Sequence, residues 1–287
     1  MSKNIALVLS GGGARGLAHI GVINELIRQD FKITSIAGTS MGALVGGMCA
    51  SGQLTSFQKW ICSLTKKDML SLVDINLYGK GFIKGEKIIE AINSKFTNCN
   101  IEDLEIPFCA VATDVTEEKE VHFTNGKLFD AVRASVSIPT VFTPYELDGK
   151  YYVDGGLVNQ VPINCVKRTK GDKVVVVYVN AKNDNSPPDK SVEEKENNGG
   201  VLDTIKQKVA TILPPFSDSG LGLFNLIDKS LSIMLHTISE LSMKNINPDI
   251  LIEISRETYG LFEFDKANEI IKVGENEARK VLKNNGI

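Results

Sequence analysis

Largely apolar short runs alternate with longer segments of helical spacing through the first third of the chain. Residues 5–9 and 33–37 have the pattern of strands buried on both faces. Apolar positions over 17–27 predict a helix between them, and the small residues of 40–49 predict a second helix that packs closely on a sheet. This alternation favours a three-layer α/β/α fold with a mostly parallel central sheet.

The pattern of strands and helices continues to the end of the chain. Further strands are predicted at 108–114, 121–123, 151–153, 174–179 and 250–254, and further helices at 54–64, 86–96, 128–137, 201–213 and 224–243. The pair Asp148-Gly149 predicts a hairpin turn before the strand at 151–153. We expect Asp265 to cap a final helix whose apolar residues form one stripe.

The regular pattern is interrupted after the strand at 174–179. Residues 183–200 hold two prolines, several Asn and Ser, and Val192 as the one large apolar residue. Apolar residues return over 201–223 but are broken by Pro and Gly, which is typical of a lid and equally of a packed helix followed by a loop. Since a strand and a helix follow, we expect a single domain over 1–287 with a mobile, lid-like insertion at about 183–222.

Composition and charge exclude several classes of protein. The chain of 287 residues is 43% hydrophobic, with 32 Lys+Arg against 35 Asp+Glu, which is unlike disordered, collagen-like or strongly basic nucleic-acid-binding proteins. No charge occurs between Lys32 and Lys59, but glycines and hydroxyl residues dilute this stretch, so we expect a buried strand, turn and helix. We therefore expect no transmembrane segment and no secretory signal.

The cysteines and histidines do not form a recognisable framework. The five cysteines, Cys49, Cys62, Cys99, Cys109 and Cys165, are an odd number with no C-x-x-C pair, and three scattered histidines add no zinc-ligand spacing. We expect free thiols, no metal and no cofactor. We also expect a cytoplasmic location, with peripheral association with membranes. The oligomeric state is left open.

A serine stands at the most distinctive local motif. Gly38-Thr39-Ser40-Met41-Gly42 is a G-x-S-x-G sequence between a predicted strand and a predicted helix. In such a nucleophile elbow, Gly38 and Gly42 leave room for the strained turn that exposes the serine. A tight strand-to-helix turn with Ser40 as a capping residue is the structural alternative.

A glycine-rich loop follows the first predicted strand. Gly11, Gly12 and Gly13 allow backbone N–H groups to converge on an oxyanion, and Arg15 either adds a donor or holds the loop. The loop also satisfies the G-x-G-x-x-G pattern of dinucleotide sites. A ribose-binding acid is expected after the second strand in those sites, whereas the nearest acid, Asp30, precedes it.

A carboxylate is the best candidate for the base that activates Ser40. Asp154 ends a predicted strand and is followed by two glycines, so it lies where a strand opens into a loop. A partly buried carboxylate there can accept the serine proton, although an Asx turn explains the residue equally well. Asp114 is the second candidate. We expect His19, His122 and His236 to be structural.

The three motifs occur in the order G-G-G-A-R-G, G-T-S-M-G and D-G-G, and together they resemble the patatin-like phospholipase family, especially its compact bacterial members. The segments around Ser135-Val136-Ser137 and Asn159-Gln160-Val161 also resemble that family, and Thr143 departs from it where relatives often carry proline. The resemblance implies that Ser40 is the nucleophile and Asp154 the base of a Ser-Asp dyad. It also implies that Gly11, Gly12, Gly13 and Arg15 form the oxyanion hole.

The implied activity is that of a carboxylic ester hydrolase acting on lipids. Such a phospholipase A, lysophospholipase or esterase would cleave fatty acyl esters through an acyl-serine, at a membrane or micelle surface. An acyltransferase that uses the same acyl-serine, and a non-catalytic lipid- or nucleotide-binding protein, are the alternatives. The head group, the acyl chain length and the acyl acceptor are left open.

Overall fold

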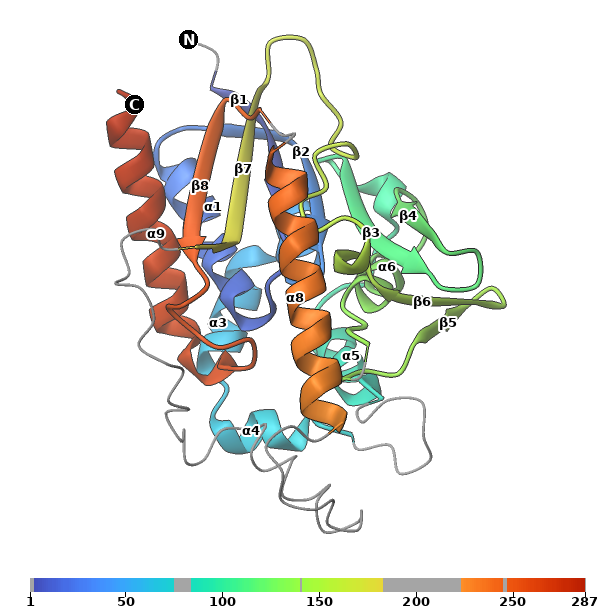
Figure 1. Cartoon of the computed structure of the whole chain (residues 1–287). Helices are drawn as coiled ribbons and strands as arrows, with labels where there is room; N and C mark the ends of the chain where they lie inside the picture. Colours follow the sequence, from blue (N-terminus) through green and yellow to red (C-terminus); the bar gives the residue numbers. More distant parts are fainter. Residues whose placement is uncertain (1–2, 75–83, 140, 183–222, 245–246, 287) are drawn as a thin grey trace.

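A mixed sheet of eight strands forms the centre of the computed structural model, which describes residues 3–74, 84–139, 141–182, 223–244 and 247–286 (Figure 1). The predicted insertion at 183–222, including its helix at 201–213, lies outside the described residues. The strands have the order β5-β6-β3-β2-β1-β7-β8, and β4 pairs with β3. Their bounds are β1 Asn4–Leu9, β2 Lys32–Thr39, β3 Phe108–Asp114, β4 Lys119–Phe123, β5 Tyr145–Leu147, β6 Lys150–Asp154, β7 Lys173–Ala181 and β8 Ile250–Ser255.

The central strands are parallel and one end of the sheet is antiparallel. β3, β2, β1, β7 and β8 run in the same direction, whereas β4, β5 and β6 pair antiparallel. Because β1 and β2 are parallel neighbours, the loops that follow them leave the same edge of the sheet. The glycine-rich loop and the Ser40 turn therefore lie side by side.

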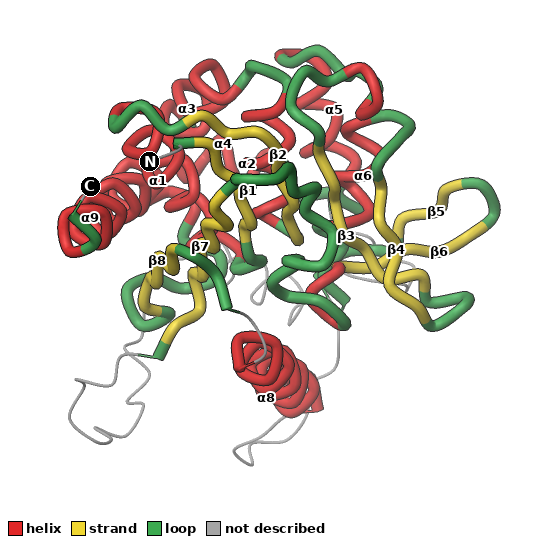
Figure 2. Tube along the Cα trace, turned by 90° about the horizontal axis from the view of Figure 1, so that it is seen from above, coloured by secondary structure: helices red, strands yellow, loops and turns green. Residues whose placement is uncertain are grey.

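Helices form the outer layers, and the two layers are unequal (Figure 2). α1, α2, α3, α6 and α9 cover one face, while α8 and the segment after β6 cover the other, where Val161, Val166 and Met243 pack on the strands. The bounds are α1 Ala18–Arg28, α2 Met41–Ala50, α3 Leu54–Ser63, α4 Lys66–Ser71, α5 Glu86–Lys95, α6 Leu128–Ser135, α8 Leu223–Lys244 and α9 Ala267–Asn284, with 3-10 turns η1 Gly13–Leu17, η2 Ile101–Asp103, η3 Gly155–Leu157 and η4 Phe264–Lys266. The predicted three-layer fold is confirmed.

The predicted elements outside the insertion are present, with two additions and one error. The hairpin at Asp148-Gly149 is confirmed, since both residues have positive φ values of 51° and 75°. α4 and β5 were not predicted. The capping role of Asp265 is wrong: α9 begins at Ala267 without a side-chain cap, and Asp265 pairs with Lys66 of α4 at 3.4 Å.

The uncharged stretch between Lys32 and Lys59 contains most of β2, the Ser40 turn, α2 and the start of α3. α2 is buried along nearly its whole length against the sheet. In the part of the chain that the structure describes, no helix combines the length and the apolar character that crossing a bilayer requires.

Two glycines allow the first and last helices to pack closely. A Cβ added to Gly21 would overlap the carbonyl oxygen of Ile271, and one added to Gly274 would overlap that of Ala18. The backbones of α1 and α9 therefore touch directly, which holds the C-terminal helix on the first βα unit.

We expect Gly274→Ala to destabilise the protein, although the same change in an open helix stabilises it by up to about 1 kcal/mol. The added methyl has no space, so the free energy of unfolding should fall by about 1–3 kcal/mol in urea denaturation. Asn276→Ala, on the exposed side of α9, is the matched control and should be neutral or stabilising. An increase in stability for Gly274→Ala would contradict the close contact.

Candidate active site

Ser40 occupies a strained turn between β2 and α2. Its backbone has φ of 54° and ψ of −124°, and a positive φ is rare for residues that have a Cβ. A Cβ on Gly38 would overlap the carbonyl of Gly42, and a Cβ on Gly42 would overlap that of Leu9. The turn therefore requires glycine at both positions, which is the arrangement that a nucleophile elbow needs.

The side chains of Ser40 and Asp154 meet. The Ser40 Oγ donates a hydrogen bond to Oδ2 of Asp154, with 2.5 Å between the two oxygens. Asp154 is placed there by β6, which pairs with β3 beside the Ser40 strand. Its Oδ1 accepts the N–H of Gly156 at 2.8 Å, so the carboxylate forms the Asx turn and binds the serine at the same time.

Burial sets the acidity of this carboxyl group. Ser40 is 5% and Asp154 6% exposed. Burial raises the pKa of Asp154 from its ordinary value of 3.8 to about 6, against the opposing effect of the hydrogen bonds from Ser40 and Gly156. Asp154 is thus ionised at neutral pH but remains basic enough to take a proton.

A second serine supports the Ser40 turn, and the sequence motifs gave it no role. The Oγ of Ser135, at the end of α6, accepts the N–H of Ser40 at 2.8 Å and donates to the carbonyl of Val111 at 2.5 Å. Thr39, just before Ser40, donates to the carbonyl of Asn159 at 2.8 Å. These bonds satisfy the polar groups that the strained turn buries.

The glycine-rich loop lies against Ser40. A Cβ on Gly11 would be 3.3 Å from the Cβ of Ser40, and the N–H of Gly11 donates to the carbonyl of Gln160 at 3.1 Å. Among the described residues, no group accepts a hydrogen bond from the N–H of Gly12 or of Gly13. The loop therefore offers two uncommitted backbone donors, while Gly11 provides the close approach.

Arg15 holds the loop. Its Nε donates to the carbonyl of Gly12 at 3.3 Å, and its guanidinium also donates to the carbonyl of Arg256 at 3.1 Å. Burial, and then the charge of Arg256, lowers its pKa to about 10, so Arg15 keeps its charge at neutral pH. Asn180 adds a bond to the carbonyl of Gly11 at 2.8 Å.

Gln160 is a buried polar residue at the site. Its Oε1 has no hydrogen-bond partner among the described residues. A Cβ on Gly11 would overlap this oxygen, and a Cβ on Gly156 would be 3.0 Å from it, so the amide lies between the glycine-rich loop and the Asp154 loop. The family-like segment Asn159-Gln160-Val161 was its one signal in the sequence.

The histidines lie outside the Ser40–Asp154 pair. His19 is fully buried, its Nε2 is 2.8 Å from the carbonyl oxygen of Ser10, and burial lowers its pKa to about 4, so it stays neutral. His122 pairs with a glutamate of its own strand, and His236 with one of its own helix. Within the described residues, none of them bonds to Ser40 or Asp154.

Asp114 is buried, and its carboxylate binds backbone N–H groups of a turn. Its Oδ1 accepts the N–H of Thr116 at 2.8 Å and of Glu117 at 3.1 Å, which shapes the turn between β3 and β4. Burial alone would raise the pKa of Asp114, but these bonds and the nearby Lys150 outweigh it and lower that pKa. The second candidate base therefore does not contact the nucleophile.

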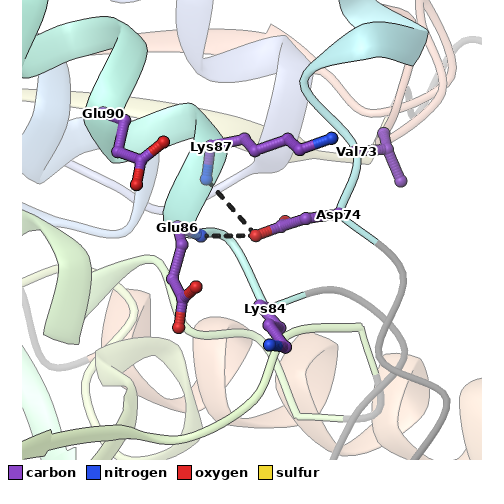
Figure 3. A pocket seen from close by; sticks show the side chains of 6 residues that line it. All are labelled: Val73, Asp74, Lys84, Glu86, Lys87 and Glu90. Atoms are coloured by element: carbon purple, nitrogen blue, oxygen red, sulfur yellow. Dashed lines mark hydrogen bonds between the residues drawn. The ribbon is translucent and has the colours of Figure 1, made fainter.

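A cavity of about 550 Å³ lies apart from the serine, at the start of α5 (Figure 3). It is lined by Val73, Asp74, Lys84, Glu86, Lys87 and Glu90. The Asp74 carboxylate accepts the N–H groups of Gly85, Glu86 and Lys87, so it caps this helix. The cavity shares no lining residue with the Ser40 site.

We expect Asp154→Asn to make the protein more stable at alkaline pH. The pKa of Asp154 is higher in the folded protein than in the unfolded chain. The contribution of this carboxyl group to the free energy of unfolding is therefore fully present below about pH 4 and is lost as the pH rises through about 6. The loss corresponds to about 3 kcal/mol, so the variant should gain up to that amount at pH 8 and nothing at pH 4 in urea denaturation.

Asp114→Asn is the matched control with the opposite sign. The pKa of Asp114 is lowered, so its contribution is present above the unfolded pKa and is lost as the pH falls through the folded one. The variant should be less stable than wild type at neutral pH, with the difference shrinking in acid. Equal pH dependence for the two variants would contradict the environments described here for the two carboxyl groups.

Known proteins resemble this chain in sequence over most of its length. A model of the patatin-like phospholipase family matches residues 7–165, more than half of the chain. Uncharacterized NTE family proteins of Mycobacterium bovis and Mycobacterium tuberculosis are each 31% identical to this chain. The alignment is 332 positions long and covers 98% of this chain and 92% of the relative. The neuropathy target esterase sws of Drosophila melanogaster is 31% identical over 189 residues, which cover 63% of this chain and 13% of that protein.

Among solved structures, that of VipD from Legionella pneumophila is similar to this chain with a TM-score of 0.49 and 14% identity, covering 98% of this chain and 66% of VipD. The extent of the family match, and the mycobacterial relatives matched over nearly their whole length, establish the family from sequence alone. The chain belongs to the patatin-like phospholipase family.

Proposed function

We propose that this protein is a serine lipid acyl hydrolase that cleaves fatty acyl esters through an acyl-Ser40 intermediate. The observation that carries the proposal is the hydrogen bond from the Ser40 Oγ to the buried Asp154 carboxylate. The family supports the substrate class, since its name denotes a phospholipase, and the relative sws is named as an esterase. No metal or cofactor is required for these steps.

Acylation begins when Asp154 takes the proton of Ser40 as the Oγ attacks the ester carbonyl carbon. The carbonyl oxygen becomes an oxyanion, which the N–H groups of Gly12 and Gly13 stabilise together with the N-terminus of α2. Collapse of this tetrahedral intermediate breaks the ester C–O bond. The departing alcohol takes the proton from Asp154, and the acyl group stays on Ser40.

Deacylation uses the same groups. Water attacks the acyl-Ser40 carbonyl while Asp154 accepts its proton, and the oxyanion forms again at Gly12 and Gly13. Collapse of this second tetrahedral intermediate breaks the bond between the acyl carbon and the Ser40 Oγ, which takes the proton back from Asp154, and the fatty acid is released. Arg15 and Asn180 act on both steps indirectly, because they hold the loop that donates the hydrogen bonds.

Apolar side chains near the site suit a lipid substrate met at a surface. Val158 follows the Asp154 loop and Leu261 lies against Gly13, and both are exposed. α8 contacts η3 and exposes Ile233 and Met234. We propose that these residues contact the membrane or micelle from the cytoplasm. The lid role expected from the sequence of 183–222 concerns residues outside those that the structure describes and stays a proposal.

We expect Ser40→Ala and Asp154→Ala each to lower ester hydrolysis by at least about a thousandfold, because each removes one half of the dyad. Hydrolysis of a short-chain ester and of phospholipid vesicles measures the loss. A fluorophosphonate should label wild type and fail to label Ser40→Ala. Product analysis with an added alcohol distinguishes hydrolase from acyltransferase.

Ser51→Ala and Asp114→Asn are the controls for that experiment. Ser51 lies at the end of α2 and bonds to the carbonyl of Met48, and Asp114 contacts neither dyad residue. Both should keep activity within a few-fold of wild type. Wild-type turnover by Asp154→Ala would disprove the dyad.

We expect kcat/KM to rise with pH through about 6 and then level off. Asp154 must be ionised to accept the serine proton, and burial raises its pKa to about 6. A soluble ester assayed at low substrate concentration gives this profile without interference from the interface. Activity that falls as the pH rises through this range would show that a different group is the base.

A further inference from the structure

Two thiols and an imidazole meet on the sheet face opposite α1, away from the dyad. The Sγ atoms of Cys109 and Cys165 and the Nε2 of His122 all lie within 4.8 Å of one another. Cys109 is buried, Cys165 is partly buried, and His122 reaches the surface. Their spacing in the sequence gives no metal motif, so only the fold brings them together.

The pairing of β3 with β4 explains how they meet. His122 is opposite Val111, two residues beyond Cys109 on β3, so the imidazole and the Cys109 thiol share one face as diagonal neighbours. Cys165 comes from the segment between η3 and β7, which packs on that face through Val161 and Val166. Its Sγ is 3.2 Å from the His122 Nε2.

A fourth donor stands beside the three. The Oε1 of Glu120 hydrogen bonds to the His122 Nε2 and lies 3.8 Å from the Cys165 Sγ. The side-chain amides of Asn159 and Asn164 donate to the same oxygen at 2.8 and 3.2 Å, and these hydrogen bonds orient the carboxylate, as hydrogen bonds to ligand side chains do in metal sites.

We propose that Cys109, His122 and Cys165, with the Glu120 carboxylate as the fourth ligand, bind a zinc ion that fixes the segment after Asp154 to the sheet. Tetrahedral zinc with Zn–S of about 2.3 Å and Zn–N of about 2.0 Å places its thiolate and imidazole donors roughly 3.5–3.8 Å apart. The donor atoms of Cys109, His122 and Cys165 lie within 4.8 Å of one another, so small shifts of the side chains would bring them to these separations. Two thiolates and an imidazole bind zinc in preference to magnesium or calcium, which favour oxygen ligands.

Binding exchanges protons for the metal. Each thiol releases one proton as its Sγ bonds to zinc, and the imidazole carries its proton on Nδ1 so that Nε2 donates its lone pair. Glu120 then leaves its hydrogen bond with Nε2 for the open tetrahedral position. The two thiolate charges and the carboxylate charge are balanced in part by Zn²⁺, without any change of oxidation state.

The site is linked to the nucleophile by hydrogen bonds. Glu120 accepts from the Asn159 side chain, and the Asn159 carbonyl accepts from Thr39, the residue before Ser40. A metal that fixes Glu120 and Cys165 therefore also fixes the loop that carries Asp154. The metal touches no reacting atom, so its role is one of positioning.

Zinc binding is tested on the full-length protein, freed of any affinity tag, reduced, stripped with a chelator and reloaded with ZnCl2 or CoCl2. We expect about one zinc per chain by elemental analysis, a thiolate-to-cobalt charge-transfer band, and a higher melting temperature with zinc. Ser40→Ala should bind the same amount, because the proposal does not depend on the esterase activity.

Ligand variants identify the donors. Cys165→Ala and His122→Gln lie at partly exposed positions, and each should lower zinc affinity by about a hundredfold and remove the zinc-dependent rise in melting temperature. Cys62→Ala, a partly buried thiol outside the cluster, is the matched control and should bind zinc as wild type does.

Three results would overturn the proposal: no zinc bound by folded, reduced wild type; equal loss of zinc in Cys62→Ala; or an unaltered cobalt spectrum in Cys165→Ala. A disulfide between Cys109 and Cys165 in unreduced protein, with no zinc uptake after reduction, would assign the pair to redox chemistry instead. A zinc site also departs from the expectation, drawn from sequence spacing, that the chain binds no metal.

Discussion

The positive φ of Ser40 is the constraint on which the rest of the site depends. A non-glycine residue in this region costs about 1–3 kcal/mol, and the surrounding structure has to supply that energy. Close packing and one hydrogen bond hold the turn in this conformation. Gly38 and Gly42 let the turn close against the carbonyl of Leu9, and the Ser135 Oγ accepts the Ser40 N–H. The strained turn therefore determines how closely β1, β2 and α2 approach one another.

Burial of Asp154 follows from the same close packing. The carboxylate lies between the Ser40 turn and the segment after β6, where little water reaches it, and its pKa rises accordingly. In the proposed mechanism a base of this strength makes a histidine unnecessary, and burial keeps His19 neutral although its hydrogen bond with the Ser10 carbonyl acts in the opposite direction. Desolvation of Asp154 thus costs folding free energy at alkaline pH and, in that mechanism, leaves the carboxylate basic enough to accept a proton.

Features with a local sequence signal could be predicted. Apolar runs gave the buried parallel strands, the G-x-S-x-G and D-G-G motifs located Ser40 and Asp154, and Asp148-Gly149 gave the hairpin. Each depends on the residues within one turn or one strand. The capping role of Asp265 failed because this residue lies inside the 3-10 turn Phe264–Lys266, which precedes α9 and places Lys266 at the cap position.

Features that depend on contacts between distant segments could not be predicted. Ser135 and Gln160 act through single hydrogen bonds or close approaches to residues on other loops, and neither has a spacing that marks it. Cys109, His122 and Cys165 meet because an antiparallel strand joins an otherwise parallel sheet and a long segment folds over it. Local spacing carries no information on such pairings.

The segment after β6 connects the two sites. It begins with Asp154, supplies through Gln160 the carbonyl that fixes Gly11, and reaches Cys165 on the far face. An irregular segment of this length has few backbone bonds to hold it, so side-chain contacts must help to position the Asp154 carboxylate. In the proposed zinc site, a bond at Cys165 would add to the contacts that Ser35 and Thr34 of β2 make with the Lys167 carbonyl and the Asp172 carboxylate, and would so fix the middle of the segment between Asp154 and β7.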